Sequence, residues 1–257
     1  MPYAPVDGIN LYYETHGQGP PIVFAHGVGG NHLIWWQQVP FFSRRFMCIT
    51  FDHRAFGLSA DQPNGPGPKA FVEDLRGLLD HLGIEKTFLV AQSMGGLACL
   101  GFALAYPERC LGLVLGSSTG AIGEDNVAGA LKRHKSPGDT RDRFAAASFV
   151  DNQPELTHLF LEISALNPPR PTNFTAIFRS GEGPKARDLK RLLAPTLIIG
   201  GEHDVVVPNE VLDKCHQLIS GSRLVIIPGA GHSTYYEKPH KFNRLVADFF
   251  DSILEKE

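Results

Sequence analysis

A sharp turn between two apolar segments constrains the fold of this chain more than any other feature. Thr87 to Val90 form a compact run typical of a buried parallel strand, and Leu97 to Tyr106 are small and apolar at helical spacing. The residues between them read Ala-Gln-Ser-Met-Gly-Gly and centre on Ser93. Small side chains around Ser93 let the strand and the helix approach closely. The turn therefore predicts a serine hydroxyl exposed at the carboxyl edge of a sheet, beside the positive end of a helix.

Strand and helix patterns alternate on both sides of this turn. We expect strands at 21–25, 46–51, 111–116, 195–200 and 223–227, and helices at about 31–43, 71–82, 209–219 and 238–254. Near the N-terminus, Asp7-Gly8 between residues 2–6 and 9–15 predicts an edge hairpin. This alternation predicts an α/β fold, with a mostly parallel sheet covered on both faces by helices.

One long segment interrupts the alternation. From about residue 120 to residue 189 the sequence is helical in character and contains no convincing core strand. We therefore expect residues 1–119 and 190–257 to form an α/β core, and residues 120–189 to form a helical insertion into that core.

Composition narrows the class of protein. The 257 residues are 43% apolar and 20% charged, as in soluble globular proteins, and the net charge of −3 favours neither nucleic acid nor an anionic membrane. We find no signal peptide and no apolar window of about 18 residues, so a cytoplasmic location is expected. The four cysteines are widely spaced in apolar surroundings, and no His-Glu-x-x-His spacing occurs. We expect buried free thiols and no metal site.

Three chemistry-bearing residues follow core strands of the predicted sheet. Ser93 follows one strand, Asp204 follows the strand 195–200, and His232 follows the last strand. The carboxyl ends of parallel strands share one edge, so these side chains should meet there. An imidazole can take the proton of a serine, and a carboxylate can orient the imidazole. Singly, Asp204 could be a helix cap and His232 a surface histidine, but their joint arrival predicts a catalytic triad.

Further motifs accompany these residues, and together they carry a resemblance to a known family. They are His26-Gly27-Val28-Gly29, Asp52-x-Arg54-x-x-Gly57-x-Ser59, Gly201-x-x-Asp204-x-x-x-Pro208, and Gly231-His232 with Glu237-x-Pro239. Over essentially its whole length the chain resembles the α/β-hydrolase fold superfamily, in particular its serine-nucleophile members of the esterase and enol-lactonase type. Ala91 and Ala55 stand where the family usually has glycine, but both keep a small side chain.

The resemblance implies a function and further site residues. The backbone N–H groups of Val28 and Met94 would form an oxyanion hole, and the insertion would be a lid over Ser93. We expect a cofactor-free serine hydrolase that cleaves a carboxylic ester or lactone of a small, largely apolar molecule through an acyl-enzyme on Ser93. A C–C bond hydrolase or lyase with the same triad, and a ligand receptor with slow turnover, remain open. Relatives with an aspartate nucleophile are disfavoured because position 93 is serine.

Candidate substrate contacts come from aromatic residues. Apolar side chains of the insertion predict a mainly apolar pocket, and we single out Trp36, Phe144, Phe160 and Tyr235. Basic residues of the insertion could hold a substrate carboxylate, although most are expected on a solvated face: Arg133, His134, Lys135, Arg141, Arg143, Arg170 and Arg179. The glycines beside His26 indicate a backbone role for that residue. The expected partner is a small molecule, and the oligomeric state stays open.

Overall fold

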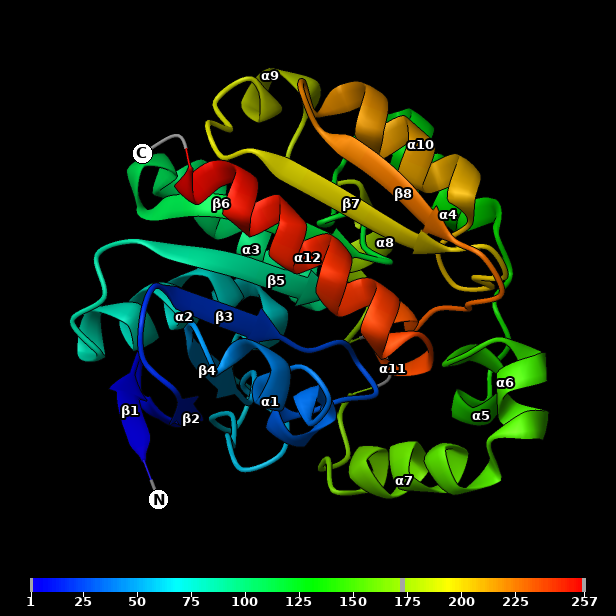
Figure 1. Ribbon diagram of the computed structural model, residues 1–257, viewed down its shortest axis with the longest axis horizontal. Helices are drawn as coiled ribbons and strands as arrows, with labels where there is room; N and C mark the ends of the chain where they lie inside the picture. Colours follow the sequence, from blue (N-terminus) through cyan, green and yellow to red (C-terminus); the bar gives the residue numbers. More distant parts are fainter. Residues whose placement is uncertain (1, 172–173, 256–257) are drawn as a thin grey trace.

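The computed structural model describes residues 2–171 and 174–255. Its eight strands form one sheet in the order β1-β2-β4-β3-β5-β6-β7-β8 (Figure 1). From β4 to β8 all neighbouring strands are parallel, whereas β2 pairs antiparallel with β1 and β4. The strands are β1 (Tyr3–Val6), β2 (Ile9–His16), β3 (Pro21–Ala25), β4 (Met47–Phe51), β5 (Thr87–Gln92), β6 (Cys110–Gly116), β7 (Thr196–Gly201) and β8 (Arg223–Ile227). The predicted α/β fold with a mostly parallel sheet is confirmed.

Helices pack on both faces of this sheet because its central strands are apolar on both sides. In β3, Val23 and Ala25 face one core cluster, while Ile22 and Phe24 face the other. The first cluster contains apolar side chains of α2 (Phe71–His81), α3 (Gly95–Ala105) and α10 (Asn209–Leu218). The second contains those of α1 (Val39–Phe42) and α12 (Pro239–Leu254). The shorter helices of the core are η1 (His32–Trp35), η2 (Gly67–Ala70), η3 (Pro107–Arg109) and α11 (Thr234–Glu237).

Two sequence expectations near the N-terminus have different outcomes. The hairpin is confirmed: Asp7 and Gly8 have φ of 41° and 78°, and Val6 pairs with Ile9. The single helix expected at 31–43 is wrong, because η1 and α1 are separate short elements. Pro40 has no N–H to continue a helix from the residues before it.

The predicted insertion contains only helices among its described residues. They are α4 (Asp125–Arg133), α5 (Thr140–Arg143), α6 (Ala147–Asn152), α7 (Pro154–Ala165), α8 (Ile177–Ser180) and α9 (Ala186–Leu189). Figure 1 shows α5, α6 and α7 gathered on the side to which the arrowheads of β5, β7 and β8 point. In contrast, α4 packs against α10 of the core. The division of the chain into a core and a lid stays a prediction.

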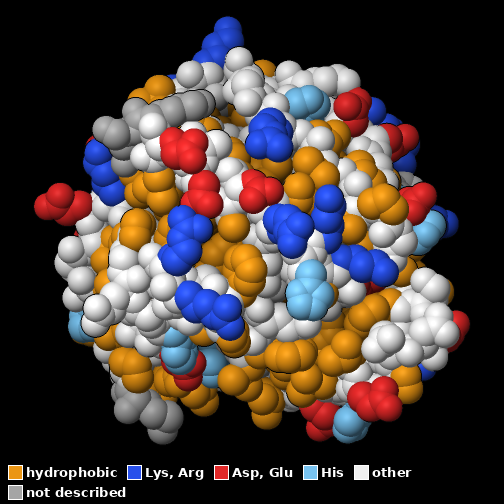
Figure 2. All heavy atoms as spheres, viewed as in Figure 1, with side chains coloured by type: hydrophobic (Ala, Val, Ile, Leu, Met, Phe, Trp, Pro, Cys, Tyr) orange, Lys and Arg blue, Asp and Glu red, His pale blue; other side chains and the backbone are white. Residues whose placement is uncertain are grey.

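Several composition-based expectations concern buried groups and surfaces. All four cysteines are buried and free, as expected. No helix in the described ranges is long and apolar enough to cross a membrane. The face of the molecule in Figure 2 carries both basic and acidic side chains.

Candidate active site

The turn after β5 holds Ser93 in a strained conformation. Its φ of 49° lies in the left-handed region, which costs a non-glycine residue about 1–3 kcal/mol and persists where the surroundings fix it. The Ser93 N–H donates to the Gly116 carbonyl at 2.9 Å, and the Ser118 hydroxyl donates to the Ser93 carbonyl at 2.5 Å. Gly95 is required for close approach, since a Cβ there would lie 2.2 Å from the Ala25 carbonyl oxygen. Contacts from β6 and β3 therefore fix the serine at the start of α3.

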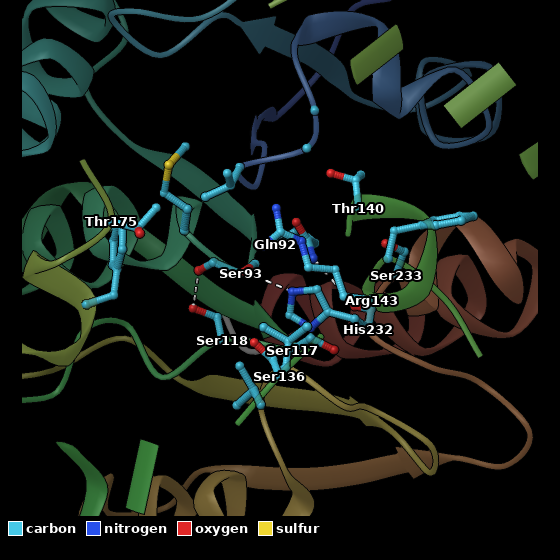
Figure 3. Close-up of a pocket in the computed structure, with 18 of the residues that line it drawn as sticks. Gln92, Ser93, Ser117, Ser118, Ser136, Thr140, Arg143, Thr175, His232 and Ser233 are labelled. Atoms are coloured by element: carbon cyan, nitrogen blue, oxygen red, sulfur yellow. Dashed lines mark hydrogen bonds between the residues drawn. The ribbon is translucent and has the colours of Figure 1, made fainter. Parts of the chain in front are cut away.

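Ser93, His232 and Asp204 form a continuous hydrogen-bonded chain (Figure 3 shows its first two members). His232 Nε2 lies 2.9 Å from Ser93 Oγ, and His232 Nδ1 lies 2.9 and 3.0 Å from the two Asp204 carboxylate oxygens. An ionised carboxylate can only accept, so Nδ1 carries the proton and Nε2 keeps a lone pair for the serine hydroxyl. The loops after β5, β7 and β8 thus bring together the three residues singled out in the sequence.

Asp204 is held in place by backbone groups. One of its oxygens accepts the N–H groups of Val206 and Val207 at 2.8 and 2.9 Å, and its side chain is fully buried. The helix α10 begins only at Asn209, so these bonds organise the loop before the helix. The alternative reading of Asp204 as a helix cap therefore accounts for one part of its contacts and leaves the bond to His232 unexplained.

Glu237 supports the loop that carries His232, a role that the sequence motif did not disclose. The buried carboxylate accepts the N–H groups of Gly231 at 2.8 Å and Ser233 at 3.1 Å, on the two sides of His232. It also accepts the Ala146 N–H at 2.9 Å, and burial raises the pKa of this carboxyl. Gly231 is needed here, since a Cβ would lie 2.2 Å from the Ala146 nitrogen. One carboxylate thus joins the His232 loop to the segment that follows α5.

His26 fixes the loop that follows β3. Its Nε2 accepts the His53 backbone N–H at 3.0 Å, so Nδ1 must carry the proton and donate to the Gly27 carbonyl at 2.8 Å. In a trans peptide the C=O and N–H point in opposite directions, so the Val28 N–H points away from His26. Burial lowers the pKa of His26 to about 4, which keeps the ring neutral at pH 7. The ring of His26 therefore holds the backbone of the loop after β3 by binding the Gly27 carbonyl and the His53 N–H.

A cavity of about 580 Å³ opens over Ser93. Val28, which follows β3, and Met94, the residue after Ser93, both line this cavity. Hydroxyl side chains share the wall with aliphatic and aromatic ones, and the expectation of a mainly apolar pocket stays a prediction. Besides Ser93 and His232, the polar members are Gln92, Ser117, Ser118, Thr119, Ser136, Thr140, Arg143, Thr175 and Ser233. Within the described residues, no group of three or more His, Cys, Asp or Glu side chains could hold a metal ion.

Three of the four aromatic candidates line this cavity. Phe144 and Phe160 stack with ring centroids 4.1 Å apart, and Tyr235 lies in the same wall. Trp36 is misplaced by the sequence reading: it is 41% exposed, is absent from the described lining, and packs edge-on against Tyr236. Its neighbour Trp35 is fully buried against Phe24 and Tyr235. The two neighbouring tryptophans therefore lie in different surroundings, Trp35 in the core and Trp36 at the surface.

Comparison with known proteins now decides the family. The model of the alpha/beta hydrolase fold family matches residues 20–167 and 137–239. The chain belongs to the α/β-hydrolase fold family. Among its α/β-hydrolase relatives is a 2-hydroxy-6-oxo-2,4-heptadienoate hydrolase from Pseudomonas putida, 32% identical over 94% of this chain and 93% of the relative. A 3-oxoadipate enol-lactonase from Acinetobacter baylyi is 28% identical over 93% of this chain and 92% of its own.

A solved structure supports the same assignment. The malate-bound structure of a thermophilic esterase from Thermogutta terrifontis superposes with a TM-score of 0.80 and 28% identity, covering 98% of both chains. These α/β-hydrolase relatives differ in the bond that their names imply, so family membership supports hydrolysis of a small molecule without fixing the substrate.

Proposed function

We propose that this α/β-hydrolase is a serine hydrolase that cleaves a carboxylic ester or lactone of a small molecule, without a cofactor. The observation that carries the proposal is the hydrogen-bonded chain: Nε2 of His232 faces the Ser93 hydroxyl, while Asp204 occupies the other ring nitrogen. The similarity to an enol-lactonase and to an esterase supports the choice of substrate class.

The geometry suits a two-step acyl transfer. Ser93 Oγ attacks the carbonyl carbon as its proton passes to His232 Nε2, and Asp204 stabilises the imidazolium. Collapse of the tetrahedral intermediate breaks the bond to the alkoxy oxygen, which leaves with that proton. Water then attacks the acyl-enzyme, again giving a proton to His232, and the acid is released as Ser93 regains its hydrogen.

The Val28 and Met94 N–H groups are the proposed oxyanion hole. Both residues line the cavity beside Ser93, and His26 turns the Val28 N–H away from the buried side of its loop. Met94 is the residue after the serine and precedes the first turn of α3, where backbone N–H groups are free to bind negative charge. One such donor typically contributes about 10²–10³ in rate.

A C–C bond hydrolase is the second candidate, favoured by one specific observation. The relative from Pseudomonas putida is named for a 6-oxo-dienoate, a ketone rather than an ester. The same serine, histidine and oxyanion donors could serve both reactions, and a comparison of substrates separates them.

Hydrolysis of p-nitrophenyl esters of graded acyl length tests the proposal. The proposal predicts turnover by the wild-type protein, loss of turnover in Ser93→Ala, and full turnover in Ser148→Ala, which changes an exposed serine of α6. Equal rates in the wild-type protein and Ser93→Ala would refute the assignment of Ser93.

The same proteins should then be given 2-hydroxy-6-oxo-2,4-heptadienoate, with loss of the dienoate absorbance as readout. A kcat/KM far above that of every ester, again dependent on Ser93, would favour the C–C hydrolase. Stoichiometric labelling of Ser93 by a fluorophosphonate without turnover of any substrate would favour a receptor.

A further inference from the structure

One arginine faces the cavity and forms no ion pair with any described carboxylate. Arg143, the last residue of α5, is half-buried and lines the same wall as Ser93 and His232. Figure 3 shows its side chain directed into the cavity, toward the side of Gln92 and His232. The described lining contains no Asp, Glu or Lys, and the arginine ion pairs of the described residues all involve other arginines. The Asp204 carboxylate is bonded to His232 and lies outside the described lining, so the Arg143 guanidinium faces the cavity with no carboxylate beside it in that lining.

The backbone that carries Arg143 is fixed relative to His232. Phe144, the next residue, is buried and stacks on Phe160. Ala146 donates its N–H to Glu237, the carboxylate that also holds Gly231 beside His232. The backbone of Arg143 therefore keeps its place relative to the reacting atoms, and the side chain extends into the cavity from a fixed point in its wall.

We propose that Arg143 is a specificity-determining residue that binds a carboxylate of the substrate. This inference rests on the proposed function and deepens it: the preferred esters or lactones are monoanions that carry a free carboxylate. A guanidinium presents paired N–H donors that match the two oxygens of a carboxylate. A phosphate monoester carries close to two charges at pH 7, and the described lining offers one arginine and no lysine to meet them.

Two pairs of probes test this without assuming which part of the substrate bears the charge. The first pair is p-nitrophenyl hemiglutarate and its methyl ester, with the carboxylate in the acyl part. The second pair is 4-acetoxybenzoate and methyl 4-acetoxybenzoate, with the carboxylate in the leaving group. Each pair differs by one charge at nearly constant shape, and the readout is the ratio of kcat/KM between anionic and neutral members.

The wild-type protein should prefer the anionic member of at least one pair. Arg143→Met, which keeps the length of the side chain, should lower that preference about ten- to hundredfold, the range of a lost charged hydrogen bond. Arg143→Lys should retain part of it. Arg141→Met is the matched control, because Arg141 lies on the same helix, is exposed and is absent from the described lining. No preference in either pair, or a preference that survives in Arg143→Met, overturns the inference.

Binding to a protein without the nucleophile separates this inference from the proposed function. Calorimetric titration of Ser93→Ala with the anionic probes should give binding that weakens about tenfold or more in the double variant Ser93→Ala/Arg143→Met. If the wild-type protein hydrolyses no ester but this binding difference is present, the proposed function fails and the anion site stands. Equal binding to both variants overturns the anion site, whatever the turnover.

Discussion

Replacing His26 by Gln isolates the contact that orients the first loop. The side-chain oxygen of Gln can take the place of Nε2 and accept the His53 N–H, which lies 3.0 Å from that atom. No group of Gln then replaces Nδ1, so the Gly27 carbonyl loses its bond of 2.8 Å from His26 and keeps the bond of 3.0 Å from the Gly30 N–H. The substitution should therefore loosen a proposed oxyanion donor while keeping the second contact of His26.

The structure sets limits on the size of the effect. The Gly27 carbonyl keeps the Gly30 donor, so the lost hydrogen bond costs about 0.5–1.5 kcal/mol, a fraction of the stability of about 5–15 kcal/mol usual for domains, and the variant should still fold. Complete loss of an oxyanion donor typically lowers kcat by about 10²–10³. A loosened peptide still samples the productive orientation, so we expect a decrease of about ten- to hundredfold in kcat with little change in KM.

The assay is the steady-state hydrolysis of a p-nitrophenyl ester beside urea unfolding of the same samples. His53→Phe is the matched control: His53 is also buried, its ring nitrogens have no partner among the described residues, and its ring stacks on Phe71. Its backbone N–H, the donor to His26, is unchanged by the substitution. A wild-type kcat in His26→Gln, or an equal loss of kcat in His53→Phe, would refute the reasoning.

Three further predictions follow from buried contacts around the site. Glu237→Ala removes the acceptor of three backbone N–H groups. We therefore expect urea unfolding to show a loss of about 3–5 kcal/mol in the free energy of unfolding, together with a lower kcat. A loss under 1 kcal/mol would contradict this. Gly231→Ala should reduce the yield of folded protein, measured by circular dichroism, because its Cβ meets Ala146; a fully active, stable variant would contradict this. Because burial lowers the pKa of His26 to about 4, the unfolded chain takes up a proton first as pH falls from 6.5 toward 4, so stability should fall by on the order of 3 kcal/mol. Urea unfolding across this range should show a shallower fall in His26→Gln, and an unchanged slope would contradict the assignment.

The sequence was sufficient for the sheet because its central strands are buried on both faces. Apolar runs such as 88–91 and 197–199 are hard to place anywhere except inside a parallel sheet, and each observed strand lies within about two residues of its expected bounds. Topology then brought Ser93, Asp204 and His232 to one edge, since strand order fixes which loops meet.

Local patterns failed where tertiary contacts decide the outcome. The apolar pattern at 31–43 predicts one helix, but η1 and α1 are separate elements. Pro40 lies in α1, and the side chain of Gln38 between the two elements bonds to Tyr235 and Asn243. Trp36 lies at this break and outside the cavity lining. Nothing in the spacing of the basic residues distinguished Arg143 from Arg141, since which one faces the cavity depends on how α5 sits. The side chain of Arg179 lies outside the described residues.

Mapping a fluorophosphonate adduct tests the central claim most directly. The wild-type protein is labelled, digested and analysed by peptide mass spectrometry, and the labelling rate is compared with that of His232→Ala. The account predicts one adduct per chain, on Ser93, formed about 10²–10⁴ times more slowly when the general base is removed. An adduct on another residue, or equally fast labelling of His232→Ala, would contradict the assignment of Ser93 and His232 as nucleophile and base.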